Sequence, residues 1–353
     1  MEQIKKAIAN PFQLGKVVDL SPEVNVLTNQ WGMINQLGIF RNEPKSQKQV
    51  LVPRTFDEDT VLTDRNWDER NNTIKRVQRD VLPMVIPHFP VDDAITPNDV
   101  DGMVDWDSLL QGGNGILAVD KVRAEKMETI RRAHALTLEV ARAQLIRDGS
   151  VYAPNGTVVT NFYTEFGLTR QVINLDLAST TDNPIGKFED VFAGIQDGVQ
   201  SGQVISDVIV LCSPSFFNAL ITNPFVFESY QYFQQPQGPA LLNGRLTANA
   251  LGLDGRYRTF NYAGMLFVEV RGSVNGQPYV ADGQAYAFPR GTDSFRTYFA
   301  PANRFSTVNR TALESYYFEY LNEKDDIIEI MTETNFLNAL LRPQVVVTLD
   351  MDA

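Results

Sequence analysis

The sequence predicts an α+β fold, and three segments carry this prediction. Residues 119–148 form one uninterrupted helical stretch, residues 45–80 have the pattern of a long charged hairpin, and residues 181–300 alternate between helix and strand patterns. With 353 residues, 43% of them hydrophobic, the chain can bury a sizeable core, and its length suggests two or three domains.

The segment before residue 41 is predicted to be an extended arm. Residues 1–40 mix short apolar pieces with Gly15, Gly32, Gly38, Pro11 and Pro22, and no hydrophobic period persists long enough to build a core. We therefore expect this arm to lie on another surface.

The hairpin is predicted at residues 45–80, which carry eight Lys or Arg and seven Asp or Glu. The flanking pieces QVLVPR and TIKRVQ alternate faces at period two, as strands do. Residues 56–72 between them are too polar to form a core of their own. A solvated surface loop is the alternative, but loops of this length are uncommon in compact domains unless they are functional or disordered. The next stretch contains Pro83, Pro87, Pro90 and Pro97, which suits edge strands or an extended connector.

The long helix is predicted over VDKVRAEKMETIRRAHALTLEVARAQLIRD, residues 119–148, which contains neither Gly nor Pro. At 1.5 Å per residue it would be about 45 Å long, and Gly149 suits its end. Glu128 with Arg131 or Arg132, and Glu139 with Arg142, have the spacing of ion pairs on an exposed helix face. Taken by itself, this segment is also consistent with a surface helix that crosses a large domain. The apolar stripe consists of Val119, Val122, Met127, Ile130, His134, Leu138, Ala141 and Leu145.

The rest of the chain is predicted to form a turn, a separate α/β unit and a final strand. Asn155-Gly156 lies between apolar alternations and predicts a hairpin turn. FEDVFAGIQDGV predicts an amphipathic helix, VISDVIVLC a buried strand, and Ser213-Pro214 the start of the next helix. GMLFVEV and YVADGQAYAF predict further strands, and the C-terminal residues end in another strand.

Composition excludes several classes of protein. A net charge of −12 argues against a nucleic-acid-binding surface over much of the molecule. The single Cys212 excludes an intrachain disulfide and fits a reducing compartment. No run has the length of a signal-peptide core or of a transmembrane helix, so we expect neither a leader nor a membrane anchor.

The sequence contains no residue pattern that is typical of an enzyme active site, so no catalytic residue, metal or cofactor is predicted. His88 and His134 are the only histidines. Both are interpreted as half-buried side chains whose hydrogen bonds are made within the protein, not as metal ligands. Cys212 follows an apolar strand and is predicted to be a buried, inert thiol. Gly113, Gly115 and Ala118 spell a dinucleotide-like turn, but no buried strand precedes them. The acids Asp99, Asp101, Asp105 and Asp107 lack the spacing of a calcium loop.

The order of these parts resembles the major capsid proteins of tailed bacteriophages, specifically the lambda-type head protein family. The resemblance covers nearly the whole chain and is carried by RRAHALTLEVARAQLIRDGSVYAPNG, GTDSFRTYFAPANR and IEIMTETNFLNALLRPQVVVTLDM. It implies a structural protein, not an enzyme. The implied divisions are an N-terminal arm at 1–40, an extended loop at 41–82, a peripheral domain at 83–180 with spine helix 119–148, an axial domain at 181–300, and a return to the peripheral domain with a C-terminal strand at 301–353.

The resemblance also implies the partners. Copies would self-assemble as hexamers and pentamers into an icosahedral shell that encloses double-stranded DNA without sequence-specific binding and without a membrane. Assembly would occur in the host bacterial cytoplasm, with separate scaffolding, portal and decoration proteins. An encapsulin-like nanocompartment shell has the same fold and is the first alternative, and an α/β enzyme is the second.

The predicted contacts between subunits lie in the hairpin and on the long helix. Trp67 is a single large apolar group among charged residues, a combination that suits an interface anchor with a polar rim. The predicted contact residues are Phe56, Arg65, Trp67, Asp68, Arg70, Arg131 and Arg132.

Overall fold

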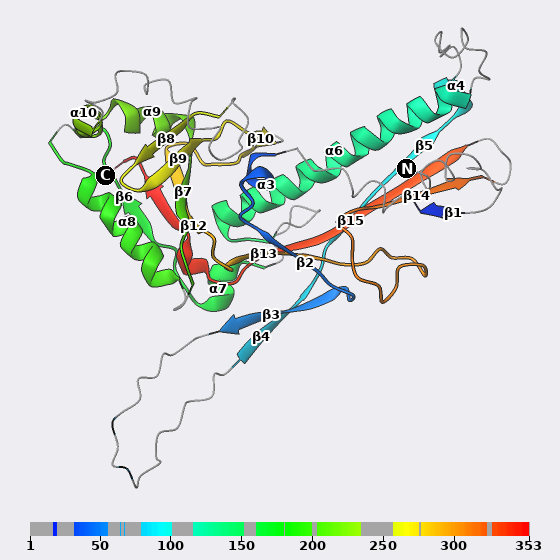
Figure 1. Cartoon of the computed structure of the whole chain (residues 1–353), viewed down its shortest axis with the longest axis horizontal. Helices are drawn as coiled ribbons and strands as arrows, with labels where there is room; N and C mark the ends of the chain where they lie inside the picture. Colours follow the sequence, from blue (N-terminus) through cyan, green and yellow to red (C-terminus); the bar gives the residue numbers. More distant parts are fainter. Residues whose placement is uncertain are drawn as a thin grey trace.

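The computed structural model describes residues 17–19, 32–55, 64, 67, 79–100, 116–151, 160–179, 181–199, 203–233, 257–274, 277–322 and 327–352. Within these residues the chain forms two six-stranded sheets, and a 33-residue helix, α6 (Ile116–Asp148), runs along one of them (Figure 1). We call this one the elongated sheet and the other the compact sheet. Mixed helix and strand content agrees with the predicted α+β class.

The elongated sheet is organised around one 13-residue strand, β15 (Ile328–Leu340). The first half of β15 lies between β14 and β5, and its second half pairs with β13. The strand order is β1-β14-β15-β13-β2, with β5 paired only to β15. The other strands are β1 (Val17–Asp19), β2 (Arg41–Pro44), β5 (His88–Ile95), β13 (Phe295–Phe299) and β14 (Tyr316–Leu321).

The compact sheet has the order β6-β16-β12-β7-β9-β8 and packs with three helices over one apolar cluster. The helices are α8 (Ile185–Gly198), α9 (Pro214–Thr222) and α10 (Pro224–Phe233). The predicted start of α9 is confirmed, because the amide of Phe216 donates to Oγ of Ser213 and Pro214 follows. The strands are β6 (Val172–Asn174), β7 (Asp207–Cys212), β8 (Thr259–Tyr262), β9 (Met265–Glu269), β12 (Gln284–Arg290) and β16 (Val347–Asp350).

Three strands belong to a different sheet from the one their sequence range suggested. β13 lies within the range 181–300 but is part of the elongated sheet, whereas β6 and β16 come from the ranges 83–180 and 301–353 and complete the compact sheet. The 3₁₀-helix η3 (Pro343–Val345) leads from β15 to β16 and so from one sheet to the other. A strand's own sequence does not specify which partner it pairs with, because pairing depends on packing against neighbouring strands.

Three short helices and a two-stranded ladder lie outside the two six-stranded sheets. The helices are α3 (Met33–Leu37), α4 (Pro97–Val100) and α7 (Phe162–Phe166). A two-stranded ladder, β10 (Ser273–Val274) with β11 (Gln277–Pro278), lies apart from both sheets. The predicted Asn155-Gly156 turn lies outside the described residues, although Ser150 and Asn161 on either side of it form an antiparallel bridge.

The long helix is confirmed, beginning three residues earlier than predicted, and its apolar stripe faces the elongated sheet. Ile130 packs with Ile95 and Tyr317, and Leu138 packs with Phe89 and Phe336. The last turns of α6 enter a larger cluster shared by both sheets, which includes Leu145 and Ile146 together with residues of β7, β12, β13 and β15. The helix therefore joins the two halves of the molecule.

Glu139 and Arg142 correct the sequence prediction, because they are buried rather than on an exposed helix face. Their exposed fractions are 1% and 5%. Glu139 accepts hydrogen bonds from the amides of Ile34 (2.7 Å) and Asn35 (2.9 Å). The spacing of two charges along a helix indicates that they can meet, but not which face they occupy.

Arg142 extends this buried cluster toward the elongated sheet. Its guanidinium donates to Oδ1 of Asn35 (2.7 Å), Oδ1 of Asn42 (3.0 Å) and Oγ1 of Thr297 (3.0 Å). Burial lowers the pKa of Arg142 to about 10, although nearby Glu139 raises it. Burial raises the pKa of Glu139, while the amides of Ile34 and Asn35 and the charge of Arg142 lower it. Loss of either partner would leave a buried charge uncompensated.

The end of the predicted arm, residues 32–40, also needs correction because it belongs to this chain's own core. In α3, Met33, Ile34 and Leu37 are buried, and Ile39 and Phe40 follow them into the cluster shared by both sheets. A five-residue helix between two glycines is too short to reveal a hydrophobic period. β1 pairs with β14, and residues 1–16 and 20–31 lie outside the described residues.

We predict that Gly32→Ala destabilises the chain by at least about 2 kcal/mol. Gly32 has φ +91°, and an added Cβ would lie 2.4 Å from Oε2 of Glu139, which accepts the hydrogen bond from the amide of Asn35 in α3. Chemical unfolding of the unassembled chain measures this change.

Gly38 provides the matched control, because it ends the same helix at φ +62° with no atom within 4 Å of an added Cβ. Gly38→Ala should cost only the left-handed backbone strain, about 1 kcal/mol. Equal losses from the two variants would show that Glu139 can move at no cost.

We predict that His134 makes the fold less stable in acid. Its Nε2 lies 3.0 Å from Oγ1 of Thr332, and burial lowers the pKa of His134 from 6.5 to about 4. Because the pKa of His134 is lower in the folded chain than in the unfolded chain, protonation of His134 favours unfolding. The stabilisation that neutral His134 gives the fold is complete above pH 6.5 and is lost as pH falls toward 4. Between pH 7 and 4.5 the native chain should lose roughly 2–3 kcal/mol more than His134→Gln. Urea unfolding at both pH values measures the difference, and equal losses would contradict the prediction.

Candidate assembly surfaces

Of the two histidines and the cysteine considered for catalysis, two are buried, whereas His88 is exposed. His134 and Cys212 are buried, and burial raises the pKa of the Cys212 thiol. Among the described residues no group of three or more His, Cys, Asp or Glu side chains is placed to hold a metal ion. None of the described helices has both the length and the apolar character needed to cross a membrane.

The acidic and glycine-rich stretch before α6 is described only in part. Asp99 accepts a hydrogen bond from the amide of Thr96 (2.9 Å), which lowers the pKa of Asp99. Its Oδ2 also lies 3.4 Å from Nζ of Lys126. Asp101, Asp105, Asp107, Gly113 and Gly115 lie outside the described residues.

Three of the seven predicted contact residues, Trp67, Arg131 and Arg132, are among the described residues. Phe56, Arg65, Asp68 and Arg70 lie outside the described residues, whereas Trp67 is fully exposed. On α6, exposed Arg132 pairs with Glu128 at 3.6 Å, as the spacing predicts. Arg131 is half-buried near Tyr317; burial raises the pKa of Tyr317 to about 12 and the charge of Arg131 lowers it. Of the three that the structure describes, Trp67 belongs to the hairpin segment, whereas Arg131 and Arg132 lie on α6.

The first candidate surface is the outer face of a two-stranded ribbon. β3 (Gln49–Thr55) and β4 (Arg79–Val85) pair antiparallel, apart from both sheets (Figure 1). β3 includes the predicted strand QVLVPR, but the predicted return strand, residues 73–78, lies outside the described residues. β4 and β5 are edge strands, as their prolines predicted.

The two faces of this ribbon have different surroundings. Val50, Val52 and Met84 are buried in the cluster shared by both sheets. On the opposite face Leu51 is 63% exposed and Val85 66% exposed, and Val81, Pro53 and Pro83 share that face through the strand register. An exposed apolar face indicates contact with another protein surface. Sequence reasoning missed it, although apolar residues on both faces of QVLVPR were the available signal.

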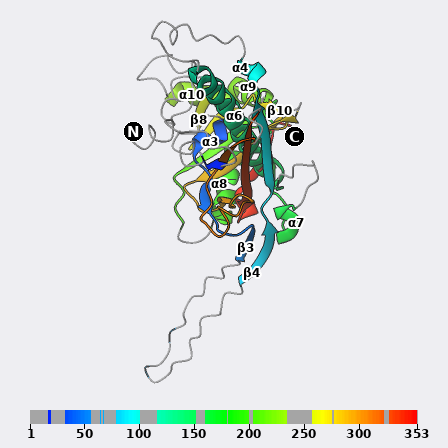
Figure 2. The same cartoon turned by 90° about the vertical axis from the view of Figure 1, so that its right-hand side faces the viewer.

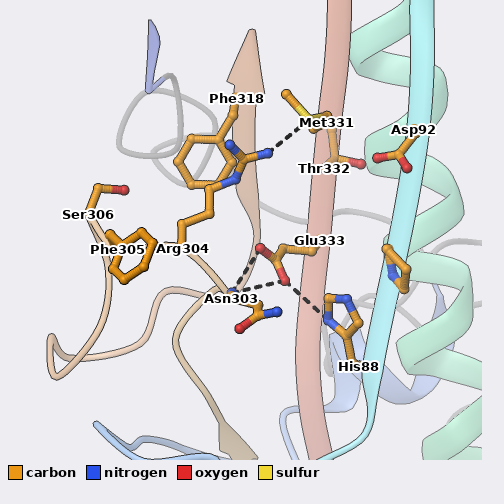
Figure 3. A pocket seen from close by; sticks show the side chains of 11 residues that line it. His88, Asp92, Asn303, Arg304, Phe305, Ser306, Phe318, Met331, Thr332 and Glu333 are labelled. Carbon is orange, nitrogen blue, oxygen red and sulfur yellow. Dashed lines mark hydrogen bonds and ion pairs between the residues drawn. The ribbon is translucent and has the colours of Figure 1, made fainter. Parts of the chain in front are cut away.

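The second candidate surface is a groove on the face of the elongated sheet opposite α6. In β5, Phe89 and Ile95 pack toward the helix side, whereas His88, Pro90 and Asp92 are exposed. A loop at residues 303–306 forms the other wall, and the open groove has a volume of about 600 Å³. Figure 3 shows its lining residues: His88, Pro90, Asp92, Asn303, Arg304, Phe305, Ser306, Phe318, Met331, Thr332 and Glu333.

The floor of the groove is polar and its hydrogen bonds are made within the chain. The Glu333 carboxylate accepts from the amide of Asn303 (3.1 Å) and from Nδ2 of Asn335 (3.3 Å), and Nδ1 of His88 lies 3.1 Å from it. His88 also lies 2.7 Å from Oδ1 of Asn335. These contacts fix the floor without forming a nucleophile activated by a base.

The loop wall is aromatic and cationic. The Arg304 guanidinium lies 4.3 Å from the centre of the Phe318 ring, and its Nη2 lies 3.0 Å from Sδ of Met331. The neighbouring Phe305 is fully exposed, and in Figure 3 it stands beside Arg304 at the edge of the groove. Arginine and aromatic side chains are the types that dominate binding energy at protein interfaces, so this wall is suited to binding a partner.

Comparisons with known proteins agree with a role in assembly. The model of the family described as phage major capsid protein E matches residues 16–351. The major capsid protein of Pseudomonas phage KPP10 is 39% identical over 342 residues, covering 93% of this chain and 95% of the relative. The major capsid protein of Salmonella phage Felix O1 is 27% identical and covers 96% of each chain.

A solved structure supports the fold at low sequence identity. The putative capsid protein of a prophage from E. coli CFT073 superposes with a TM-score of 0.61 at 10% identity, covering 95% of this chain and 99% of the other. The named relatives are phage proteins, so the encapsulin-like alternative is not favoured. The chain belongs to the phage major capsid protein E family and is a structural protein of the capsid shell.

Proposed function

We propose that copies of this chain form the hexamers and pentamers of an icosahedral shell around double-stranded DNA, and that the β3–β4 hairpin is the arm by which each copy holds its neighbour. The observation that carries the second part is the apolar outer face of the ribbon, where Leu51 and Val85 are mostly exposed. Fully exposed Trp67, between the two strands in sequence, supports the same role.

The two sheets suggest that the subunit has two domains with different positions in the shell. The elongated sheet with α6 would be the peripheral domain, and the compact sheet would be the axial domain at the centre of each capsomer. The extended arrangement of α6 along β5 and β15 supports this division, because a long stiff body presents edges to several neighbours (Figures 1 and 2).

The remaining parts of the proposal rest on net charge and on membership of the capsid protein family. A net charge of −12 would limit adhesion of DNA to the shell, which suits enclosure without sequence-specific binding. Scaffolding, portal and decoration functions would come from separate proteins, and assembly would occur in the host bacterial cytoplasm. The chain itself would act as a structural protein without enzymatic turnover.

We predict that replacing residues 56–72 by an Asn-Gly turn leaves folding intact and blocks shell formation. These 17 residues carry six acidic and two basic side chains around Trp67, so they contribute little to a core. Circular dichroism and thermal unfolding should match those of the native chain. Electron microscopy should show either no closed shells or only aberrant particles.

Two other outcomes would contradict the proposed role of the β3–β4 hairpin. Normal shells from the deletion would make the hairpin a solvated loop, and a chain unable to fold would place it in the core. Trp67→Ala should give a milder assembly defect with unchanged folding, since truncating an interface aromatic often costs about 2 kcal/mol per contact.

We predict that Cys212 has no role in assembly beyond packing. Its thiol is fully buried in β7, so it cannot form a disulfide between copies. Shells should be identical with and without reductant, and Cys212→Ala should assemble normally. Particles that dissociate on reduction, or a catalytic turnover abolished by the substitution, would contradict this structural role.

A further inference from the structure

We propose that the groove beside Phe305 is the socket for the hairpin of a neighbouring copy, with Trp67 of one copy inserted between Phe305 and Arg304 of the next. This inference rests on the proposed function and names the partner surface of the hairpin. Other parts of a neighbouring copy are the competing occupants of the groove.

The charge of the loop wall is complementary to that of the hairpin segment. Residues 56–72 carry an excess of acidic side chains, and Asp64, near Trp67, is exposed. Around the loop wall, Lys48, Arg304 and Arg310 form no ion pair with any described residue. Lys48 instead donates to Oδ1 of Asn303 (2.6 Å), which holds it beside the groove. Unneutralised cations on one surface attract an acidic segment of another.

The groove is also organised to receive an aromatic ring. Arg304 is held in place by Phe318 and Met331, so little side-chain freedom is lost when a second ring stacks near it. The polar floor is satisfied by contacts around Glu333, so covering it with an indole would leave few unpaired groups. A volume of about 600 Å³ is ample for one indole and its flanking backbone.

The occupant comes from another molecule. Trp67 is fully exposed in its own chain and therefore does not fill its own groove. Phe305 is equally exposed, so both surfaces are uncovered in the single chain. Because the chain is a shell protein, a second copy is present wherever the first one functions. The one acidic side chain on the β5 wall, Asp92, is available to Arg65 or Arg70, the basic residues that flank Trp67 in the sequence.

Two single-cysteine substitutions in full-length chains test the pairing. Chains carrying Trp67→Cys and chains carrying Ser306→Cys are co-expressed, and the oxidised particles are run on a denaturing gel without reductant. Covalent dimers should form in the mixture and not in either variant alone, and Cys212 does not interfere because it is buried. Val204→Cys, at another exposed apolar position, replaces Ser306→Cys as the control and should give no dimer.

A second measurement does not depend on the cysteine variants assembling. A synthetic peptide of residues 56–72 should inhibit assembly of the native full-length chain, and the same peptide with Trp67→Ala should need a concentration about thirtyfold higher. Phe305→Ala should fold normally and lose shell formation, whereas Val204→Ala should retain it. Higher salt should weaken the peptide's effect, because exposed charges are screened.

The outcomes separate this inference from the proposed function. If the 56–72 deletion blocks assembly but Phe305→Ala assembles like Val204→Ala, the hairpin is an arm and the groove is not its socket. If Phe305→Ala blocks assembly but neither dimers nor peptide inhibition appear, another part of the neighbour fills the groove and the assignment of Trp67 is wrong. Normal shells from the deletion would overturn the arm itself.

Discussion

The buried carboxylate of Glu139 is the contact on which the rest of the structure depends. It accepts two amides of α3 from 105 and 104 residues away in the sequence, and Arg142 one helical turn later binds Asn42 of β2 and Thr297 of β13. Four segments thus meet at one ionic cluster inside a low-dielectric core, where an incomplete set of partners would be costly. That cost favours a single arrangement of the N-terminal segment over the many that its apolar residues alone would permit.

This arrangement fixes where the assembly surfaces begin. β2 follows α3 after a few residues and pairs in parallel with β13, and β3 begins shortly after β2 ends. Val50, Val52 and Met84 then anchor the base of the ribbon in the same apolar cluster that receives the end of α6 and residues of both sheets. The outer face of the ribbon is consequently held at a defined place on the body, although it makes no contribution to the core itself.

The sequence predicted elements better than their partners. The helix at 119–148, the Ser213 cap and the strand at Cys212 follow from local period and capping chemistry, and they were confirmed. The burial of Glu139, the placement of β13 and β16, and the groove at Phe305 depend on residues tens to hundreds of positions apart. Neither a charged pair on a helix nor a lone aromatic residue in a loop carries information about such distant neighbours.

In the proposed assignment, folding and assembly use different apolar residues. Leu51, Val85 and Phe305 remain exposed in the folded chain, so they add little to its stability, whereas the core residues are not accessible to another copy. A net charge of −12 opposes premature association of such exposed surfaces through mutual repulsion. Since a closed shell repeats each contact at every copy, contacts too weak to hold two free subunits together can still hold the complete shell. If the proposed surfaces are used in this way, the subunit can fold first and close the shell afterwards.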